Sequence, residues 1–370
     1  MTDKFKAWLC LKSAFGTKPK TALELVKKYP HPEEYVGNPQ HLIYEDDTIP
    51  PQIKEQLLSA VPHPREEQIA KLCEHYEINA IFYGDEDYPL ALANIILPPL
   101  ILYYRGDLLK ALNNISLAVV GTRKPTAYGK NACSKLLAPV CQREVTIVSG
   151  LAYGIDTVSH ITALQNGAMT IAVLASGVEN IYPPANRELA KEIINNGALV
   201  SEYEPGTKLE SWNFPARNRI ISALAPVTFV VEGSMTSGAM ITAKHALEQN
   251  HDLIALPGEI YHPNAQGPNY LIKNGAQCIT CPEDILYALG IEVEEREQLE
   301  FLPEISPDEQ KIYDLFREEQ RELSFDELLL KTGYSFGKLS TILLNLELKG
   351  LIIFFFLMIR RPPRSTRLAT

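Results

Sequence analysis

The sequence predicts an α/β protein, with an extended Rossmann-like, doubly wound parallel sheet flanked by a small helical domain and a winged-helix-like domain. Short apolar runs of strand length recur through the middle of the chain, helical stretches separate them, and glycine-containing turns follow several of the runs. Buried strands that alternate with helices of about 10–15 residues are typical of a parallel sheet with helices on both faces.

The expected elements of this core follow one another in order. The strands are predicted at 80–83, 98–106, 116–120, 146–148, 170–174, 198–201, 227–231 and 253–256. The helices are predicted at 65–77, 128–140, 155–166, 186–196, 215–223 and 239–250. Right-handed crossovers between parallel strands place such helices on both faces of the sheet.

Changes in composition divide the 370 residues into domains. Residues 1–64 are predicted to form short helices, which make up either a helix-hairpin-helix-like nucleic-acid module or a bundle used for packing and protein contact. The core spans 65–290, and an acidic linker spans 291–306. Residues 307–352 have the three-helix spacing of a winged helix, which binds either DNA or protein.

The last segment, 353–370, departs from this pattern. It contains an unpatterned apolar run followed by RRPPRSTRLAT. We expect it to be a non-native tail, similar to translated sequencing adapter, that leaves the winged helix truncated; a membrane anchor or basic tail is the alternative. The apolar run is shorter than the roughly 20 residues that a membrane span needs.

Charge and cysteine content narrow the class of protein. A net charge of −10 argues against coating duplex DNA through a broad basic surface. Residues 115–290 carry 12 Lys and Arg against 14 Asp and Glu, so a nucleic-acid site would be a local groove in this region. Six scattered cysteines and the absence of a recognisable leader predict a cytoplasmic protein without a disulfide framework or membrane contact.

Turns that follow the predicted strands supply the candidate binding residues, because helix N-termini point free N–H groups at the carboxyl ends of parallel strands. The first turn places a guanidinium group, that of Arg123, at a strand end, where it suits a phosphate. None of the turns has the G-x-G-x-x-G or P-loop pattern, so a dinucleotide or ATP cofactor is not expected. The candidate turn residues are Gly121, Thr122, Arg123, Ser149, Gly150, Gly177, Ser237 and Gly238.

The segment FPARNR adds an aromatic ring, two arginines and an amide at a loop–helix junction. Phe214 offers a flat face, while Arg217, Asn218 and Arg219 offer donors for phosphate. Arginines beside an aromatic ring suit a ligand that has both phosphates and base faces. We therefore predict a nucleotide or single-stranded nucleic-acid site here.

Two other patterns are open to a functional and a structural interpretation. Asp156 and His160 share one face of a helix, which suits either acid–base chemistry or a helix N-terminus with a packed histidine. Cys278 and Cys281 form one C-x-x-C without a second pair, so two thiols are expected rather than zinc. We predict no catalytic residue and no metal.

Seven ordered blocks of sequence resemble the DNA-processing protein A family (DprA, also called Smf). They are VGTRKPTAYG, SGLAYGIDTVSH, VLASGVENIYPPAN, SEYEPG, FPARNRIISAL, VVEGSMTSGAMITA and LPGEIYHPNAQGPNYLIKNGA. The resemblance covers about residues 83–278. It implies the same three-part domain organisation, with a helix-hairpin-helix-like or SAM-like domain at residues 1–64, an extended Rossmann core and a winged helix.

The resemblance implies a non-enzymatic protein that binds incoming single-stranded DNA during natural transformation, protects it and loads the RecA recombinase. It also implies a homodimer joined through the Rossmann core, with dimer and RecA contacts near residues 271–286. Carried over by motif, Arg123 grips a phosphate and Phe214 contacts a base. Many relatives have a lysine where this chain has Ser211, and Lys208 is a possible replacement.

Two alternatives come from other functional classes. A Rossmann-type nucleotide hydrolase, similar to phosphoribohydrolases, would carry a Gly-Gly-x-Gly-Thr turn where this chain has GSMTSG. A purely structural interaction protein would not bind DNA at all.

Overall fold

The protein is described by a computed structural model that covers residues 3–16, 18–59, 64–292, 305–319, 323–349, 351–355 and 358–360. The chain forms two compact units, which divide after residue 293. None of the helices in the described ranges combines the length and the apolarity needed to cross a bilayer.

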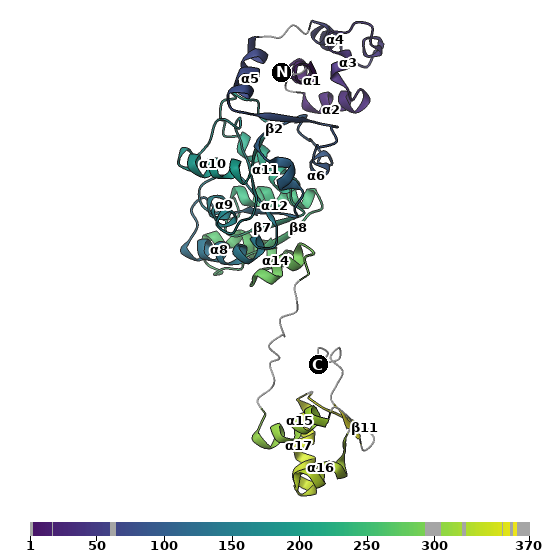
Figure 1. Ribbon diagram of the computed structural model, residues 1–370, viewed down its shortest axis with the longest axis vertical. Coiled ribbons are helices and arrows are strands. Elements are labelled where there is room, and N and C mark those ends of the chain that lie inside the picture. Colours follow the sequence, from purple (N-terminus) through teal and green to yellow (C-terminus); the bar gives the residue numbers. More distant parts are fainter. Residues whose placement is uncertain are drawn as a thin grey trace. The chain divides into compact units, whose positions relative to one another are not determined.

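A nine-stranded sheet lies at the centre of the amino-terminal unit (Figure 1), in the order β1-β2-β6-β5-β4-β3-β7-β8-β9. The strands are β1 (Asn79–Phe82), β2 (Ile101–Gly106), β3 (Ser116–Val120), β4 (Thr146–Ser149), β5 (Thr170–Val173), β6 (Gly197–Ser201), β7 (Val227–Val230), β8 (Asp252–Ala255) and β9 (Gln277–Cys278). Strands β3 to β9 pair with one another in parallel. The sheet is doubly wound, as the apolar runs predict.

One edge of the sheet departs from the predicted parallel arrangement. Strand β2 runs antiparallel to β6, and β1 runs antiparallel to β2. Strand direction depends on the connection between strands, because an apolar run has the same composition in either orientation. Strand β9 is only two residues long and was not predicted.

Helices cover both faces of the sheet. On one face, α8, α9 and α14 pack on Leu117, Val119 and Phe229. On the other face, α6, α7, α11, α12 and α13 pack on Ala118 and Val230. The helices are α6 (Leu90–Ala93), α7 (Leu108–Leu112), α8 (Ala127–Cys141), α9 (Ile155–Gln165), α10 (Arg187–Asn195), α11 (Asn213–Ala223), α12 (Gly238–Glu248), α13 (Gln266–Lys273) and α14 (Pro282–Ala288).

The amino-terminal helices share a hydrophobic core with the antiparallel edge of the sheet, and Figure 1 shows them gathered beyond β2. They are α1 (Asp3–Phe15), α2 (Pro19–Lys28), α3 (Pro32–Tyr35), α4 (Pro51–Leu58) and α5 (Pro64–His75). Trp8 is 1% exposed and stacks on Phe82 with ring centroids 5.3 Å apart. The predicted helical segment 1–64 is therefore packed against the core in one unit.

The carboxy-terminal unit has three helices and a small sheet. Helices α15 (Pro307–Glu319), α16 (Phe325–Thr332) and α17 (Phe336–Leu348) enclose a core that includes Ile312, Leu328 and Leu343. Ser324 and Glu327 form a reciprocal capping box at the start of α16. The order of helices is that of a winged helix.

Part of the predicted tail belongs to this small sheet. Strands β11 (Ile353–Phe355) and β12 (Met358–Arg360) form an antiparallel pair, and β12 also pairs with β10 (Leu323–Ser324). This hairpin forms from residues that we had assigned to the tail, and the truncation of the wing stays a prediction. The foreign origin of 353–370 stays a prediction, and residues 361–370 lie outside the described residues.

Candidate nucleic-acid site

The candidate site lies where the strand order reverses. From β3 the chain winds through β4 and β5 to β6 on one side, and from β7 it winds through β8 to β9 on the other. Adjacent parallel strands whose following helices go to opposite sides leave a crevice at their carboxyl ends, where ligands bind in open α/β sheets. Strands β3 and β7 are these neighbours, and the Arg123 turn follows β3.

The Arg123 turn is held by a buried carboxylate. The backbone N–H of Thr122 donates to the carbonyl of Glu232, 2.7 Å away. The backbone N–H and the hydroxyl of Thr126 donate to the Glu232 carboxylate at 2.9 and 2.5 Å. The Thr126 hydroxyl also caps α8 by accepting from the Gly129 N–H. Glu232 is 5% exposed, so it holds the turn from the protein interior. Arg123 lies on the solvent side of the turn and is exposed.

Arg123, Phe214 and Tyr182 form one cluster, which we call the Arg123–Phe214 platform. The Arg123 guanidinium carbon lies 5.0 Å from the centroid of the Phe214 ring. The Tyr182 and Phe214 ring centroids are 5.8 Å apart in an edge-on arrangement, and Tyr182 is 43% exposed. Phe214 itself is half-buried. A cation beside partly exposed aromatic rings suits a backbone phosphate and a stacked base at the same time.

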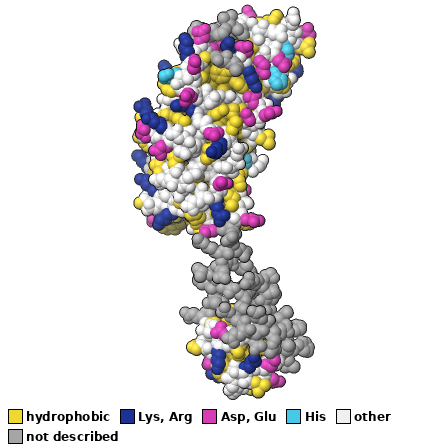
Figure 2. All heavy atoms as spheres, viewed as in Figure 1, with side chains coloured by type: hydrophobic (Ala, Val, Ile, Leu, Met, Phe, Trp, Pro, Cys, Tyr) yellow, Lys and Arg dark blue, Asp and Glu magenta, His cyan; other side chains and the backbone are white. Residues whose placement is uncertain are grey.

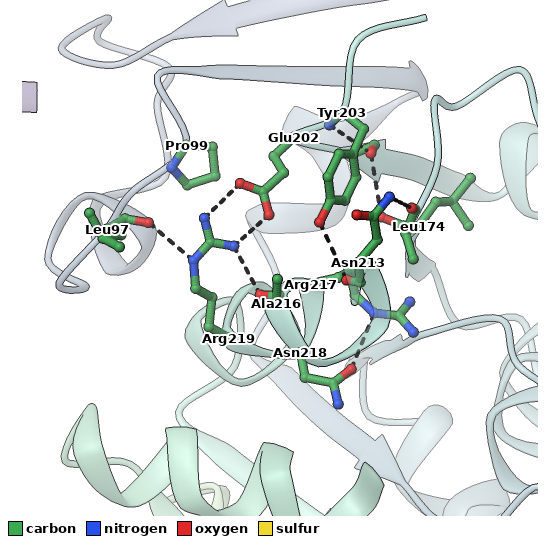
Figure 3. Close-up of polar contacts among 12 residues, drawn as sticks. Leu97, Pro99, Leu174, Glu202, Tyr203, Asn213, Ala216, Arg217, Asn218 and Arg219 are labelled. Atoms are coloured by element: carbon green, nitrogen blue, oxygen red, sulfur yellow. Dashed lines mark hydrogen bonds and ion pairs between the residues drawn. The ribbon is translucent and has the colours of Figure 1, made fainter. Parts of the chain in front are cut away.

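Arg217 does not join the platform, which corrects our prediction that it contacts the ligand. Its side chain is 3% exposed, and its Nη1 donates to the carbonyls of Gly150, at 2.8 Å, and Val173. Its Nε donates to Oδ1 of Asn218 (Figure 3). Burial lowers the pKa of Arg217 to about 10. The guanidinium thus ties α11 to the carboxyl ends of β4 and β5.

Arg219 and Asn218 also have structural partners. Arg219 forms a two-pronged ion pair with Glu202, with both N–O distances 2.6 Å, and its Nε donates to the carbonyl of Leu97 (Figure 3). Its side chain is 18% exposed. The Asn218 amide donates to the carbonyl of Gly238. The ARNR segment therefore fixes the helix that presents Phe214, and the predicted ligand contacts of Arg219 and Asn218 are not supported.

Two of the candidate glycines make room for packed side chains. A Cβ atom on Gly150 would lie 2.6 Å from the Arg217 guanidinium, and one on Gly177 would lie 2.5 Å from the Glu179 carboxylate. Both glycines are buried, so they do not face a ligand. The same holds for Ser149, whose hydroxyl donates to the carbonyl of Val119.

The remaining candidate residues lie near the carboxyl ends of the parallel strands, which we call the rim. Ser237 is the residue before α12, and Gly238 begins the helix at a place where an added Cβ atom would have no neighbour within 4 Å. Thr122 is partly exposed beside Arg123, and Gly121 packs closely against Ile155. The structure thus brings Thr122, Arg123, Ser237 and Gly238 to the ends of the adjacent strands β3 and β7.

Asp156 and His160 lie in the interior, so the acid–base hypothesis is not supported. Asp156 is 7% exposed and accepts from the Ala152 N–H, and His160 is fully buried with its Nδ1 2.7 Å from the Thr170 hydroxyl. Burial raises the pKa of Asp156 and lowers that of His160 to about 3. A substrate cannot reach either side chain.

Because His160 is buried, we expect the free energy of unfolding to depend on pH. Because the folded pKa of about 3 lies below the ordinary value of 6.5, the unfolded chain binds a proton first as the pH falls. The histidine should therefore lower the free energy of unfolding by up to about 1.4 kcal/mol for each pH unit between 6.5 and 3. Chemical denaturation at several pH values measures this slope.

His160→Gln is the control for that slope. The raised pKa of Asp156 acts in the opposite direction, but it is present in both proteins, so the difference between them isolates His160. We expect a shallower loss of stability below pH 6 in the variant. Equal slopes would show that the imidazole is not held neutral.

Sequence reasoning missed Glu232 and Asn264. Asn264 donates through its amide to the carbonyl of Lys124, and its own carbonyl accepts from the Gly233 N–H. A glutamate directly after a buried strand and before a glycine is the signal that could have identified Glu232. Asn264 has no such signal, because its partners are distant in sequence.

Charge around the site is mixed. Figure 2 shows basic and acidic side chains interspersed over the face of the amino-terminal unit that it presents. Ser211 and Lys208 are both exposed. The six cysteines are free, with Cys281 at the start of α14, and no group of three or more metal-ligating side chains occurs in the described part of the chain.

Comparisons with known proteins agree with this architecture. The sequence profile of the family described as DNA recombination-mediator protein A matches residues 79–290, and that of the DprA winged helix domain matches residues 300–353. DNA processing protein DprA of Bacillus subtilis is 40% identical over 61% of this chain and 76% of its own length. Protein Smf of Synechocystis is 36% identical over 75% of this chain and 79% of its own.

Two solved structures are similar in fold and in sequence. DNA processing protein A from Streptococcus pneumoniae superposes with a TM-score of 0.67 at 32% identity, covering 80% of this chain and 99% of that protein. DNA processing protein A from Helicobacter pylori superposes with a TM-score of 0.53 at 31% identity, covering 58% of this chain and 96% of that protein. The latter structure was described for its single-stranded DNA binding mode.

Proposed function

Because the chain belongs to the DNA recombination-mediator protein A family, we propose that it binds single-stranded DNA at the carboxyl edge of its sheet, in DNA processing and recombination. The observation that carries this proposal is the Arg123–Phe214 platform at the point where the strand order reverses. The structure of DNA processing protein A from Helicobacter pylori was described for its single-stranded DNA binding mode, and the similarity of this chain to that protein supports the proposal.

The platform favours unpaired nucleotides over a duplex. Stacking on Phe214 or Tyr182 requires a base whose face is free, and base pairs in a duplex already stack on each other. Arg123 can accompany such a base by contacting the adjoining phosphate. The expected ligand contacts are therefore Arg123, Phe214 and Tyr182, with Thr122, Ser237 and Gly238 along the rim.

Further partners follow from the family resemblance and are proposed on that basis. We propose that the protein acts in the cytoplasm, delivers bound DNA to RecA and dimerises through the Rossmann core near residues 271–286. Leu271 and Leu286 are buried, whereas Tyr270 and Tyr287 at the ends of this segment are 48% and 78% exposed. These two tyrosines are therefore available for a contact between chains.

The winged-helix unit is less suited to DNA. The two lysines of α17 and its C-cap both have acidic partners, since Lys338 lies 2.8 Å from Asp308 and Lys349 lies 2.8 Å from Glu309. Contacts with phosphate would have to displace these carboxylates. We propose a protein-interaction role for this unit.

We propose a binding protein rather than a nucleotide hydrolase. The pair that suggested acid–base chemistry, Asp156 and His160, is buried. The residue that organises the rim, Glu232, is also buried, and its carboxylate accepts hydrogen bonds from Thr126. No observation at the rim favours hydrolysis over binding.

A salt titration with single-stranded and duplex oligonucleotides of equal length tests the proposed function. We expect tighter binding to the single strand, and a linear fall of log affinity with log salt whose slope is about −0.7 for each phosphate neutralised. The slope should be modest, because few cations line the rim. Equal affinity for both DNA forms, or release of free base from nucleoside monophosphates, would contradict the proposal.

A further inference from the structure

A loop on the other side of the Arg123 turn presents two large apolar side chains to solvent. Between β8 and α13, Ile260 is 71% exposed and Tyr261 is 84% exposed. Single exposed apolar residues are common on proteins and need no function. This pair differs because the loop that carries it is anchored on both sides.

The beginning of the loop is attached to α8 and α13. The hydroxyl of Tyr128 donates to the carbonyl of Pro257 at 2.7 Å. Gly258 and the side-chain amide of Asn269 exchange two hydrogen bonds, at 3.1 and 2.9 Å. The loop therefore leaves the sheet in a fixed direction.

The end of the loop is attached to the two turns of the candidate site. The Asn264 amide donates to the carbonyl of Lys124 at 3.0 Å, and the Asn264 carbonyl accepts from the Gly233 N–H at 2.6 Å. His262 stabilises the approach to this contact, since its Nδ1 accepts from the Asn264 N–H. Lys124 directly follows Arg123, so the loop is joined to the phosphate-binding turn itself.

Chain geometry limits how far Tyr261 lies from that turn. Tyr261 is three residues before Asn264, and a chain spans at most about 3.6 Å per residue. The Cα atom of Tyr261 therefore lies within about 11 Å of that of Asn264. This is about the length of three stacked nucleotides at 3.4 Å each.

The strand order places this loop on the other side of Arg123 from Tyr182 and Phe214. Tyr182 follows β5 and Phe214 follows β6, whereas Tyr261 follows β8. Arg123 follows β3, which lies between β5 and β8 in the sheet. The sheet thus orders three points along one edge: an aromatic cluster, a guanidinium group and a second exposed aromatic ring.

We propose that Tyr261, supported by Ile260, is a second base-stacking site, so that a single strand crosses the sheet edge from Phe214 past Arg123 to Tyr261. This inference rests on the proposed function and extends its site. Lys124, which directly follows Arg123, is exposed and favours the backbone phosphates, while exposed Glu259, two residues before Tyr261, opposes them. Stacking therefore contributes most of the binding at this end.

Tyr261→Ala and Tyr261→Trp test the site with oligonucleotides of increasing length. The alanine variant should bind the shortest strands as the unmodified protein does, and should lose about 5- to 150-fold in affinity once the strand reaches the loop. Tryptophan should restore the affinity, because it keeps a flat face. Leu247→Ala removes an exposed apolar side chain near the opposite edge and should change nothing.

The outcomes separate this inference from the proposed function. If Arg123→Ala abolishes binding but Tyr261→Ala loses nothing at any length, the second stacking site is wrong and the platform stands. If Tyr261→Ala leaves DNA affinity intact but lowers the mass in sedimentation, the loop is a contact between chains, which also overturns the inference. If no strand binds to the unmodified protein, the proposed function itself fails.

Discussion

Replacement of Arg217 by alanine is expected to lower the free energy of unfolding of the amino-terminal unit by roughly 3–5 kcal/mol. The guanidinium is 3% exposed and donates to the carbonyls of Gly150 and Val173. Alanine leaves both buried acceptors without this donor and creates a cavity beneath the strand ends. It also removes a positive charge that stabilises the ionised form of buried Asp156.

Tryptophan fluorescence during chemical denaturation measures this loss. The chain has two tryptophans, Trp8 and Trp212, and both lie in the amino-terminal unit, so the signal reports on that unit alone. Arg143→Ala is the matched control, since Arg143 is exposed at the end of α8, near the opposite edge of the sheet. An unchanged denaturation midpoint in Arg217→Ala would contradict the structural role.

The same variant distinguishes support of the fold from contact with DNA. If Arg217 gripped a phosphate, its removal would weaken DNA binding and leave the denaturation curve unchanged. Our account predicts the opposite result. Arg217→Ala should be less stable than the unmodified protein, but should keep its DNA affinity under conditions in which the variant stays folded. Arg217→Lys should be intermediate in stability, because one ammonium group cannot reproduce donors that point in several directions.

Most of the fold could be predicted because its strands are buried on both faces. Strand β3 was predicted with the same bounds that it has in the structure, and every one of its residues is buried. A continuous apolar run bounded by turns carries that information in its composition. The direction of β1 and β2 could not be predicted in this way, since antiparallel pairing depends on connections that have no apolar pattern.

The candidate site was predicted in part. Arg123 and Phe214 come together as expected, although they are 91 positions apart in the chain. Arg217 and Arg219 were predicted to share the groove, yet residues two apart on a helix lie about 200° apart around its axis and cannot face the same ligand. Helical spacing alone could have excluded one of them. The burial of Arg217 depends on the carbonyls of Gly150 and Val173, which are distant in sequence and are not indicated by any local pattern.

The central claim is that Arg123 and Phe214 act together on an unpaired strand. Stacking on an aromatic side chain is worth about 1–3 kcal/mol, and a hydrogen bond to a charged group about 1.5–3 kcal/mol. Each single alanine variant should therefore lose roughly 5- to 150-fold in affinity. Because the guanidinium lies over the ring, we expect the two losses to be non-additive in the double variant.

The most direct test measures the dissociation constants of one single-stranded oligonucleotide for the unmodified protein, Arg123→Ala, Phe214→Ala and the double variant, with Arg143→Ala as the control. We predict weaker binding in both single variants, a coupling between them, and unchanged denaturation curves. Unchanged affinity in Arg123→Ala and Phe214→Ala, with the fold intact, would remove the platform from the DNA site and contradict the account.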